Sequence, residues 1–137
     1  HALEIAQLAD HVRALPEGLD SIVGRRGSRF SGGQLQRLAV GRMILTDPSV
    51  VILDEATSAL DLETEHHLFS ALQEFLEGRT TLIVAHRLSA LRLADRVLVF
   101  EHGRVLEAGS PDELVSRQGP YARVLHSHRG DGMSANA

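Results

Sequence analysis

The feature that most constrains the fold is a strand, helix, strand succession in the middle of the chain. Residues 50–53 are a continuous aliphatic and β-branched run, typical of a strand buried on both faces of a parallel sheet. Residues 62–76 place apolar side chains at helical spacing, and residues 80–85 predict another buried strand. This order predicts a βαβ crossover and therefore an α/β fold with a parallel sheet core and flanking helices.

The flanking segments predict further helices and a β-hairpin. Periodicity and turn residues predict helices over 3–12, 34–45, 112–117 and 121–126, and hairpin strands over 97–100 and 105–108. The helix over 34–45 is expected to bury one apolar face, formed by Leu35, Leu38, Ala39 and Met43. Residues 127–137 are small and polar, and we expect this tail to be disordered.

Composition excludes several classes of protein. The 137 residues carry a formal net charge of −4, which argues against a nucleic-acid binder. The chain has no cysteine, so disulfide frameworks and thiolate zinc sites are excluded. All 14 basic residues are arginine, so chemistry that needs a lysine must take it from elsewhere. The chain begins at His1 without a methionine, and we expect it to be the final part of a longer polypeptide.

Polar residues follow both predicted central strands. Asp54 and Glu55 follow the first strand, and His86 follows the second. Ligands of open parallel sheets bind beyond the carboxyl ends of the strands, so these side chains are candidate functional groups. Asp54 is suited to holding Mg²⁺ and Glu55 to orienting an attacking water, although acidic residues after a strand also commonly cap the next helix.

A second candidate is the sequence Ser31, Gly32, Gly33, Gln34 at the start of the helix predicted after it. Glycines let backbone N–H groups approach a phosphate, and the helix N-terminus adds partial positive charge. The alternative is a plain N-cap in which Ser31 closes the first helical turn. Gly27 to Gly32 has the glycine spacing of a Walker A loop, but Gly33 and Gln34 stand where Lys and Ser or Thr are required.

Three motifs together resemble the nucleotide-binding domain of ABC transporters. Residues 30–34 are similar to its signature motif, residues 51–61 to its Walker B motif and D-loop, and residues 85–87 to its H-loop. The resemblance extends from about residue 5 to residue 126, and residues 11–18 and 23–27 are similar to exporter-type domains. It implies the C-terminal part of such a domain.

The resemblance also implies a role for each candidate residue. Glu55 would be the general base of ATP hydrolysis, Asp54 the Mg²⁺ ligand, and His86 the contact to the γ-phosphate. The signature residues would bind the ATP held by a partner domain, and Asp61 would lie in the D-loop at the dimer interface. The signature residues are Ser31, Gly32, Gly33 and Gln34.

From the resemblance we expect ATP and Mg²⁺ as cofactors, and a second nucleotide-binding domain and a transmembrane domain as partners. The location would be the cytoplasmic face of the inner membrane. Residues 1–46 would belong to the helical subdomain and residues 47–126 to the ATPase core. Because the Walker A lysine and the Q-loop are not in this sequence, the isolated chain is expected to bind ATP weakly and to be inactive.

Three residues depart from the family pattern, and other functions stay open. Phe30 replaces the usual leucine, Leu35 stands where relatives carry a polar residue, and Arg25 where exporters often have glutamate. The alternatives are an ABC-type ATPase without a transport role and a catalytically silent ABC module. Residues 24–27 also fit the GXXG loop of RNA-binding KH domains, which the acidic net charge disfavours.

Overall fold

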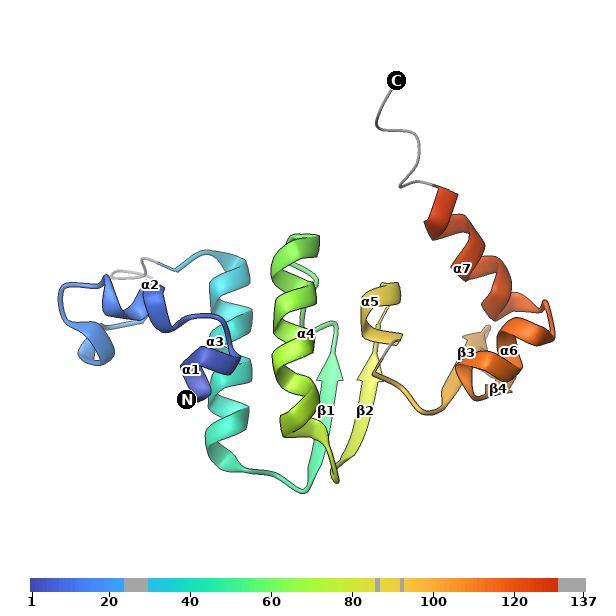
Figure 1. Ribbon diagram of the computed structural model, residues 1–137, viewed down its shortest axis with the longest axis horizontal. Helices are drawn as coiled ribbons and strands as arrows, with labels where there is room; N and C mark the ends of the chain where they lie inside the picture. The colour runs from blue at the N-terminus through green and yellow to red at the C-terminus, as the bar shows by residue number, and fades with distance from the viewer. Residues whose placement is uncertain (24–29, 86, 92, 131–137) are drawn as a thin grey trace. The chain divides into compact units, whose positions relative to one another are not determined.

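A computed structural model describes residues 1–23, 30–85, 87–91 and 93–130. The chain forms two compact units, His1–Val84 and Ala85–Ala137 (Figure 1). The structure confirms the α/β class. The predicted boundary after residue 46 falls inside the first unit, so the division into subdomains stays a prediction.

The first unit contains the predicted βαβ crossover. Its elements are α1 (Ala2–Ile5), α2 (Ala9–Arg13), a 3-10 turn (Gly18–Asp20), α3 (Gly32–Thr46), β1 (Val50–Asp54), α4 (Leu62–Leu76) and β2 (Thr80–Val84). Strands β1 and β2 pair in parallel, in a register that sets Val50 opposite Thr80 and Asp54 opposite Val84. Helix α4 connects them and has the bounds that periodicity predicts.

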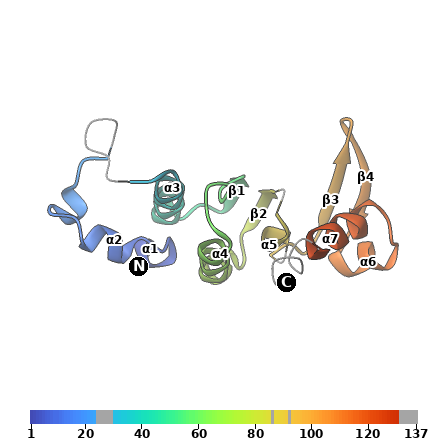
Figure 2. The same cartoon turned by 90° about the horizontal axis from the view of Figure 1, so that it is seen from above.

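One face of this small sheet is covered and the other is exposed. Val51 and Leu53 are buried, whereas Val50 and Ile52 are 58% and 65% exposed. Figure 2 shows α4 on one side of β1 and β2, and no other described helix covers the opposite side within this unit. The prediction that the strand is buried on both faces is therefore wrong for the described chain, because only alternate side chains meet a helix.

Helix α4 supplies the apolar side chains that pack under the sheet. Leu68, Phe69 and Leu72 are buried, as their spacing predicts. Glu65 lies one turn earlier on the same face and is also fully buried. His66 and His67 lie on the exposed side of the helix.

The helix predicted over residues 3–12 is wrong as a single helix, because the structure divides it into α1 and α2. The break is at Gln7, which has the positive φ of 55°. The Arg37 guanidinium of α3 donates a hydrogen bond to the Gln7 carbonyl. This tertiary contact uses a backbone oxygen that a continuous helix would have kept for its own ladder.

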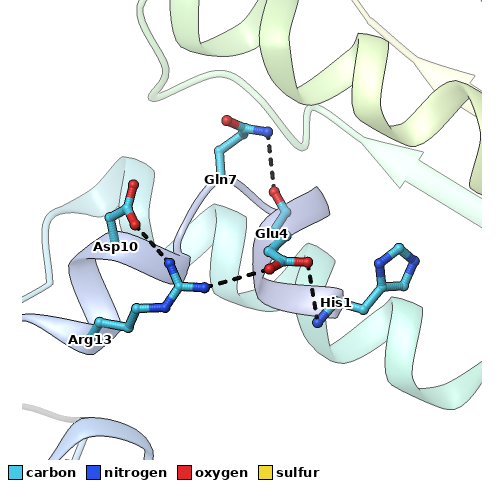
Figure 3. A network of polar contacts seen from close by, with 5 residues as sticks. All are labelled: His1, Glu4, Gln7, Asp10 and Arg13. Carbon is cyan, nitrogen blue, oxygen red and sulfur yellow. Dashed lines mark hydrogen bonds and ion pairs between the residues drawn. The ribbon is translucent and has the colours of Figure 1, made fainter.

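Polar contacts link the two short helices at the surface (Figure 3). Arg13 lies 2.9 Å from Asp10 and 3.5 Å from Glu4, and the Gln7 amide donates to the Glu4 carbonyl. The side chains of Arg13, Asp10 and Glu4 are mostly exposed. We therefore expect each ion pair to contribute at most about 1 kcal/mol to the free energy of unfolding.

Helix α3 buries a different face from the predicted one. Its buried residues are Val40, Gly41 and Ile44, whereas Leu35 is 42% exposed. A Cβ at Gly41 would meet the Ala6 Cβ at an ordinary 3.5 Å, so the buried face of α3 lies against the α1 segment. The predicted face is wrong because apolar residues surround α3, and its contact with α1 selects which of them are buried.

The second unit contains the predicted hairpin. Its elements are α5 (Leu88–Leu91), β3 (Val97–Glu101), β4 (Arg104–Gly109), α6 (Pro111–Ser116) and α7 (Pro120–Gly130). Strands β3 and β4 pair antiparallel around a turn at His102 and Gly103, both with positive φ. Its core is formed by Val97, Leu114 and Tyr121. Helix α7 continues past its expected end at residue 126, and residues 131–137 lie outside the described residues.

The packing of α4 predicts a difference between two leucines of the same helix. Leu68 is fully buried and Leu62 is 76% exposed. We expect Leu68→Ala to lower the free energy of unfolding by about 2–5 kcal/mol and Leu62→Ala by less than about 1 kcal/mol. Denaturant unfolding of the two variants measures this, and equal losses would contradict the assigned packing face.

Candidate functional site

Two carboxylates lie where the sequence predicts them, at the carboxyl end of β1. Asp54 is the last residue of the strand and Glu55 follows it; both side chains are exposed. The Glu55 backbone N–H donates to the Val84 carbonyl at 3.0 Å, so Glu55 is held beside the end of β2. Glu55 has a φ of 45°, a region that non-glycine residues seldom occupy and that is often found at functional sites.

Besides the tail, sequence predictions for His86 and for the loop of residues 24–29, which includes Arg25, fall on residues that the structure does not describe. The role of His86 therefore remains a prediction.

The start of α3 is an N-cap, as the plainer interpretation of the sequence expects. The Ser31 hydroxyl accepts from the Gln34 N–H at 3.2 Å, and the Ser31 N–H donates to the Gln34 Oε1 at 2.7 Å. This capping box fixes the first turn. Ser31 and Gly32 are exposed, and the N–H groups of Gly32 and Gly33 are not used by the capping box, so they can donate to an anion.

Gln34 connects the helix start to α2. Its Oε1 is used by Ser31, and its Nε2 lies 3.3 Å from the His11 Nδ1. The His11 ring in turn packs edge-on against Phe30, with 5.0 Å between ring centroids. The Gln34 side chain is thus engaged within the chain, where it holds Ser31 in place. The contact with His11 could not be found from the sequence, because the two residues are 23 positions apart.

The two glycines of the helix start differ in their surroundings. A Cβ on Gly33 would lie 2.8 Å from the Ala59 carbonyl oxygen and 2.9 Å from the Leu60 Cδ2. A Cβ on Gly32 would meet only the Ala59 Cβ, at an ordinary 3.9 Å. Gly33 therefore allows α3 to pack directly on the loop between β1 and α4, residues 55–61, which we call the β1–α4 loop.

Side chains hold the β1–α4 loop from two sides. The Gln36 amide of α3 donates to the Ser58 hydroxyl at 2.8 Å and accepts from the Ala59 N–H at 3.0 Å. Behind the loop, the buried Thr57 hydroxyl donates to the buried Glu65 carboxylate. No local sequence pattern predicts the contacts that Gln36 and Thr57 make. Glu65 had a signal, since it is an acidic residue on the apolar face of α4.

Asp61 ends the loop and caps α4. Its carboxylate accepts from the Thr64 N–H at 2.9 Å and from the Thr64 hydroxyl at 2.7 Å. These hydrogen bonds, that of the backbone first, lower the pKa of Asp61 below its ordinary value of 3.8. The cap therefore contributes its full stabilisation at pH values above the ordinary pKa of Asp61. This stabilisation is lost as the pH falls through the lower pKa that Asp61 has in the folded chain.

The arrangement combines an anion site with exposed carboxylates. The start of α3 offers N–H groups and a helix dipole to a phosphate, and the end of β1 offers Asp54 and Glu55 to a cation and a water. Within the described residues, no group of three or more His, Asp and Glu side chains could hold a metal ion.

Comparison with known proteins identifies the family. The family model described as ABC transporter matches residues 3–58. An ATP-dependent lipid A-core flippase of Burkholderia orbicola (strain AU 1054) is 57% identical over 128 residues, which are 93% of this chain and 21% of the flippase. The chain matches part of an exporter-type ABC transporter. Its resemblance to exporter-type nucleotide-binding domains is confirmed.

Other relatives agree with this match. A flippase of the same name from Ralstonia nicotianae (strain ATCC BAA-1114 / GMI1000) is 53% identical over 88% of this chain and 20% of the flippase. Another from Dechloromonas aromatica (strain RCB) is 47% identical over 95% of this chain and 22% of the flippase. The solved structure of a bacterial Atm1-family ABC exporter with ATP bound matches with a TM-score of 0.83 and 40% identity, over 93% of this chain and 22% of that one. The chain spans about a fifth of the length of the curated relatives it matches. None of its described helices is both long and apolar enough to cross a bilayer.

The surroundings of the two glycines predict unequal effects of the same substitution. We expect Gly33→Ala to lower the free energy of unfolding by about 1–3 kcal/mol, because the new methyl group would collide with the Ala59 carbonyl. Gly32→Ala should be neutral or slightly stabilising, since it meets only an ordinary contact in the first helical turn. Thermal or denaturant unfolding distinguishes them, and a larger loss for Gly32→Ala would refute the close packing.

Proposed function

We propose that this chain supplies two parts of the ATPase domain of an ABC exporter. They are α3, which we call the signature helix, and the carboxylates of Asp54 and Glu55, which serve ATP hydrolysis. We further propose that the whole protein is an ATP-dependent flippase and that its substrate is lipid A-core. This substrate is suggested by the names of relatives that are 47% to 57% identical to this chain. The observation that carries the ATPase proposal is the position of Glu55, at the carboxyl end of β1 and at the start of a loop that packs on α3.

Glu55 would orient and deprotonate the water that attacks the γ-phosphate. Its exposed carboxylate and its fixed backbone, hydrogen-bonded to the end of β2, support this role. His86, which follows β2 in the sequence, would contact the γ-phosphate. Phosphoryl transfer leaves little covalent chemistry to the protein, so the main contribution of both residues is position and charge.

Asp54 fits a magnesium site that depends on substrate. Mg²⁺ keeps several waters and needs only one or two carboxylates besides phosphate oxygens, so a single exposed aspartate suffices. When bound, the ion would neutralise charge on the phosphates. Asp54 would hold it through a water molecule.

The start of α3 would bind the nucleotide of a partner domain. Gly32 and Gly33 would present their N–H groups, Ser31 its hydroxyl and the helix its dipole to the γ-phosphate across a dimer interface. Gln34 would contribute by holding Ser31 through the capping box. Asp61, at the other end of the β1–α4 loop, would lie near the same interface.

This assignment requires two ATPase domains. The sequence has no lysine, so a Walker A loop must come from another segment of the protein. We propose a head-to-tail dimer in which each ATP lies between one domain's carboxylates and the other's signature helix, attached to transmembrane domains on the cytoplasmic side of the membrane.

An ABC ATPase without transport is disfavoured by the exporters and flippases among the relatives. A silent module is disfavoured by the presence of Glu55 and His86.

Substitution of Glu55 in the full-length protein tests the hydrolytic role. We expect Glu55→Gln to lower ATP turnover about 100-fold or more and to trap a nucleotide-bound dimer, because binding is retained while water activation is lost. Glu63→Gln, an exposed change in the first turn of α4, is the control. Steady-state hydrolysis and size-exclusion chromatography with ATP measure both effects, and near-normal turnover by Glu55→Gln would reject the assignment.

The isolated chain provides a separate test. Because the site is divided between segments and the lysine lies elsewhere, calorimetric titration with Mg-ATP should release little or no heat. Tight binding by these 137 residues would mean that the chain contains a complete site, contrary to the proposal.

A further inference from the structure

The β1–α4 loop is attached to α3 by one side chain in particular. Gln36 lies one turn after Gly33 and makes both of its polar contacts with this loop, through Ser58 and Ala59. The Ala59 backbone N–H can only donate, so the Oε1 of Gln36 must face it and the Nε2 must face the Ser58 hydroxyl. Gln36 is thus held in one orientation by two neighbouring residues of the loop.

The contact continues from the loop to Glu55. The Ser58 N–H donates to the Glu55 carbonyl at 3.1 Å. A short path of hydrogen bonds therefore runs from α3 through Gln36 and Ser58 to the residue proposed to activate water. The close approach of Gly33 to Ala59 is a second, independent contact between the same two segments.

We propose that Gln36 is a positioning residue that fixes the β1–α4 loop, and through it Glu55, relative to the nucleotide-binding start of α3. This inference rests on the proposed function, in which the start of α3 binds one ATP and Glu55 of the same chain acts on the other. Gln36 would then link the two nucleotide sites within one chain: closure of α3 on a partner's ATP sets the position of Glu55 at the chain's own ATP.

The chemistry of Gln36 allows a matched pair of variants. Gln36→Met keeps the length of the side chain and removes both hydrogen bonds. Gln36→Glu keeps an acceptor for the Ala59 N–H and places a carboxylate oxygen beside the Ser58 hydroxyl. Gln73→Met, at an exposed position of α4, is the control for the same chemical change elsewhere.

The experiment uses the full-length protein and measures kcat and KM for ATP, binding of a fluorescent ATP analogue, and the melting temperature. We expect Gln36→Met to lower kcat about tenfold, which corresponds to about the net free energy of one hydrogen bond in water. Binding of the ATP analogue should change by less than about twofold. Gln36→Glu should stay within about threefold of the wild-type kcat, and Gln73→Met should be unchanged.

A double-mutant cycle separates positioning from general stability. Ser58→Ala should lower kcat in the wild-type background and have little further effect in Gln36→Met, since both changes remove the same contact. Additive effects, an unchanged kcat in Gln36→Met, equal losses in Gln36→Met and Gln36→Glu, or a fall in kcat that only follows the melting temperature would overturn the inference.

The outcome also shows whether the inference or the proposed function has failed. If the wild-type protein hydrolyses ATP and Glu55→Gln does not, while Gln36→Met behaves as wild type, the inference alone is wrong. If neither the wild type nor Gln73→Met hydrolyses ATP, the proposed function and the inference built on it are both rejected.

Discussion

The candidate site depends on the close packing of α3 against the β1–α4 loop. Gly33 makes this possible, because any side chain there would occupy the space of the Ala59 carbonyl. The contact holds two exposed functional segments together: the capped start of α3 and the carboxylates at the end of β1. Buried Thr57 and Glu65 support the loop from its other side. The proposed chemistry thus rests on a loop that is held between two helices.

Much of the fold follows from local sequence patterns. The bounds of α4 follow from its helical periodicity and its Asp61 cap, and the hairpin from a turn at His102 and Gly103. The placement of Asp54 and Glu55 was also predictable, since a continuous aliphatic run defines where β1 ends. The capping role of Ser31 follows from residue type and position alone. These features are determined by residues within a few positions of one another.

Features set by distant contacts could not be predicted. The break at Gln7 accompanies a hydrogen bond from Arg37, and the buried face of α3 is selected by its contact with α1. Burial of β1 on only one face depends on which helices the chain places beside it. Gln36 has no distinguishing sequence feature, and its partners are 22 and 23 residues away. Its importance appears only when the start of α3 and the β1–α4 loop are seen together.

The central claim is that the signature helix and Glu55 of one chain serve different nucleotides. Mixed full-length dimers test it by single-turnover hydrolysis of prebound ATP, with Glu55→Gln and an obstructing Gly32→Phe placed on the same chain or on opposite chains. On opposite chains the two changes should damage one site, so that one of the two bound ATP molecules is still cleaved; on the same chain they should damage both, and cleavage should be lost. Cleavage that survives in the same-chain arrangement and is lost in the opposite-chain arrangement would contradict the account.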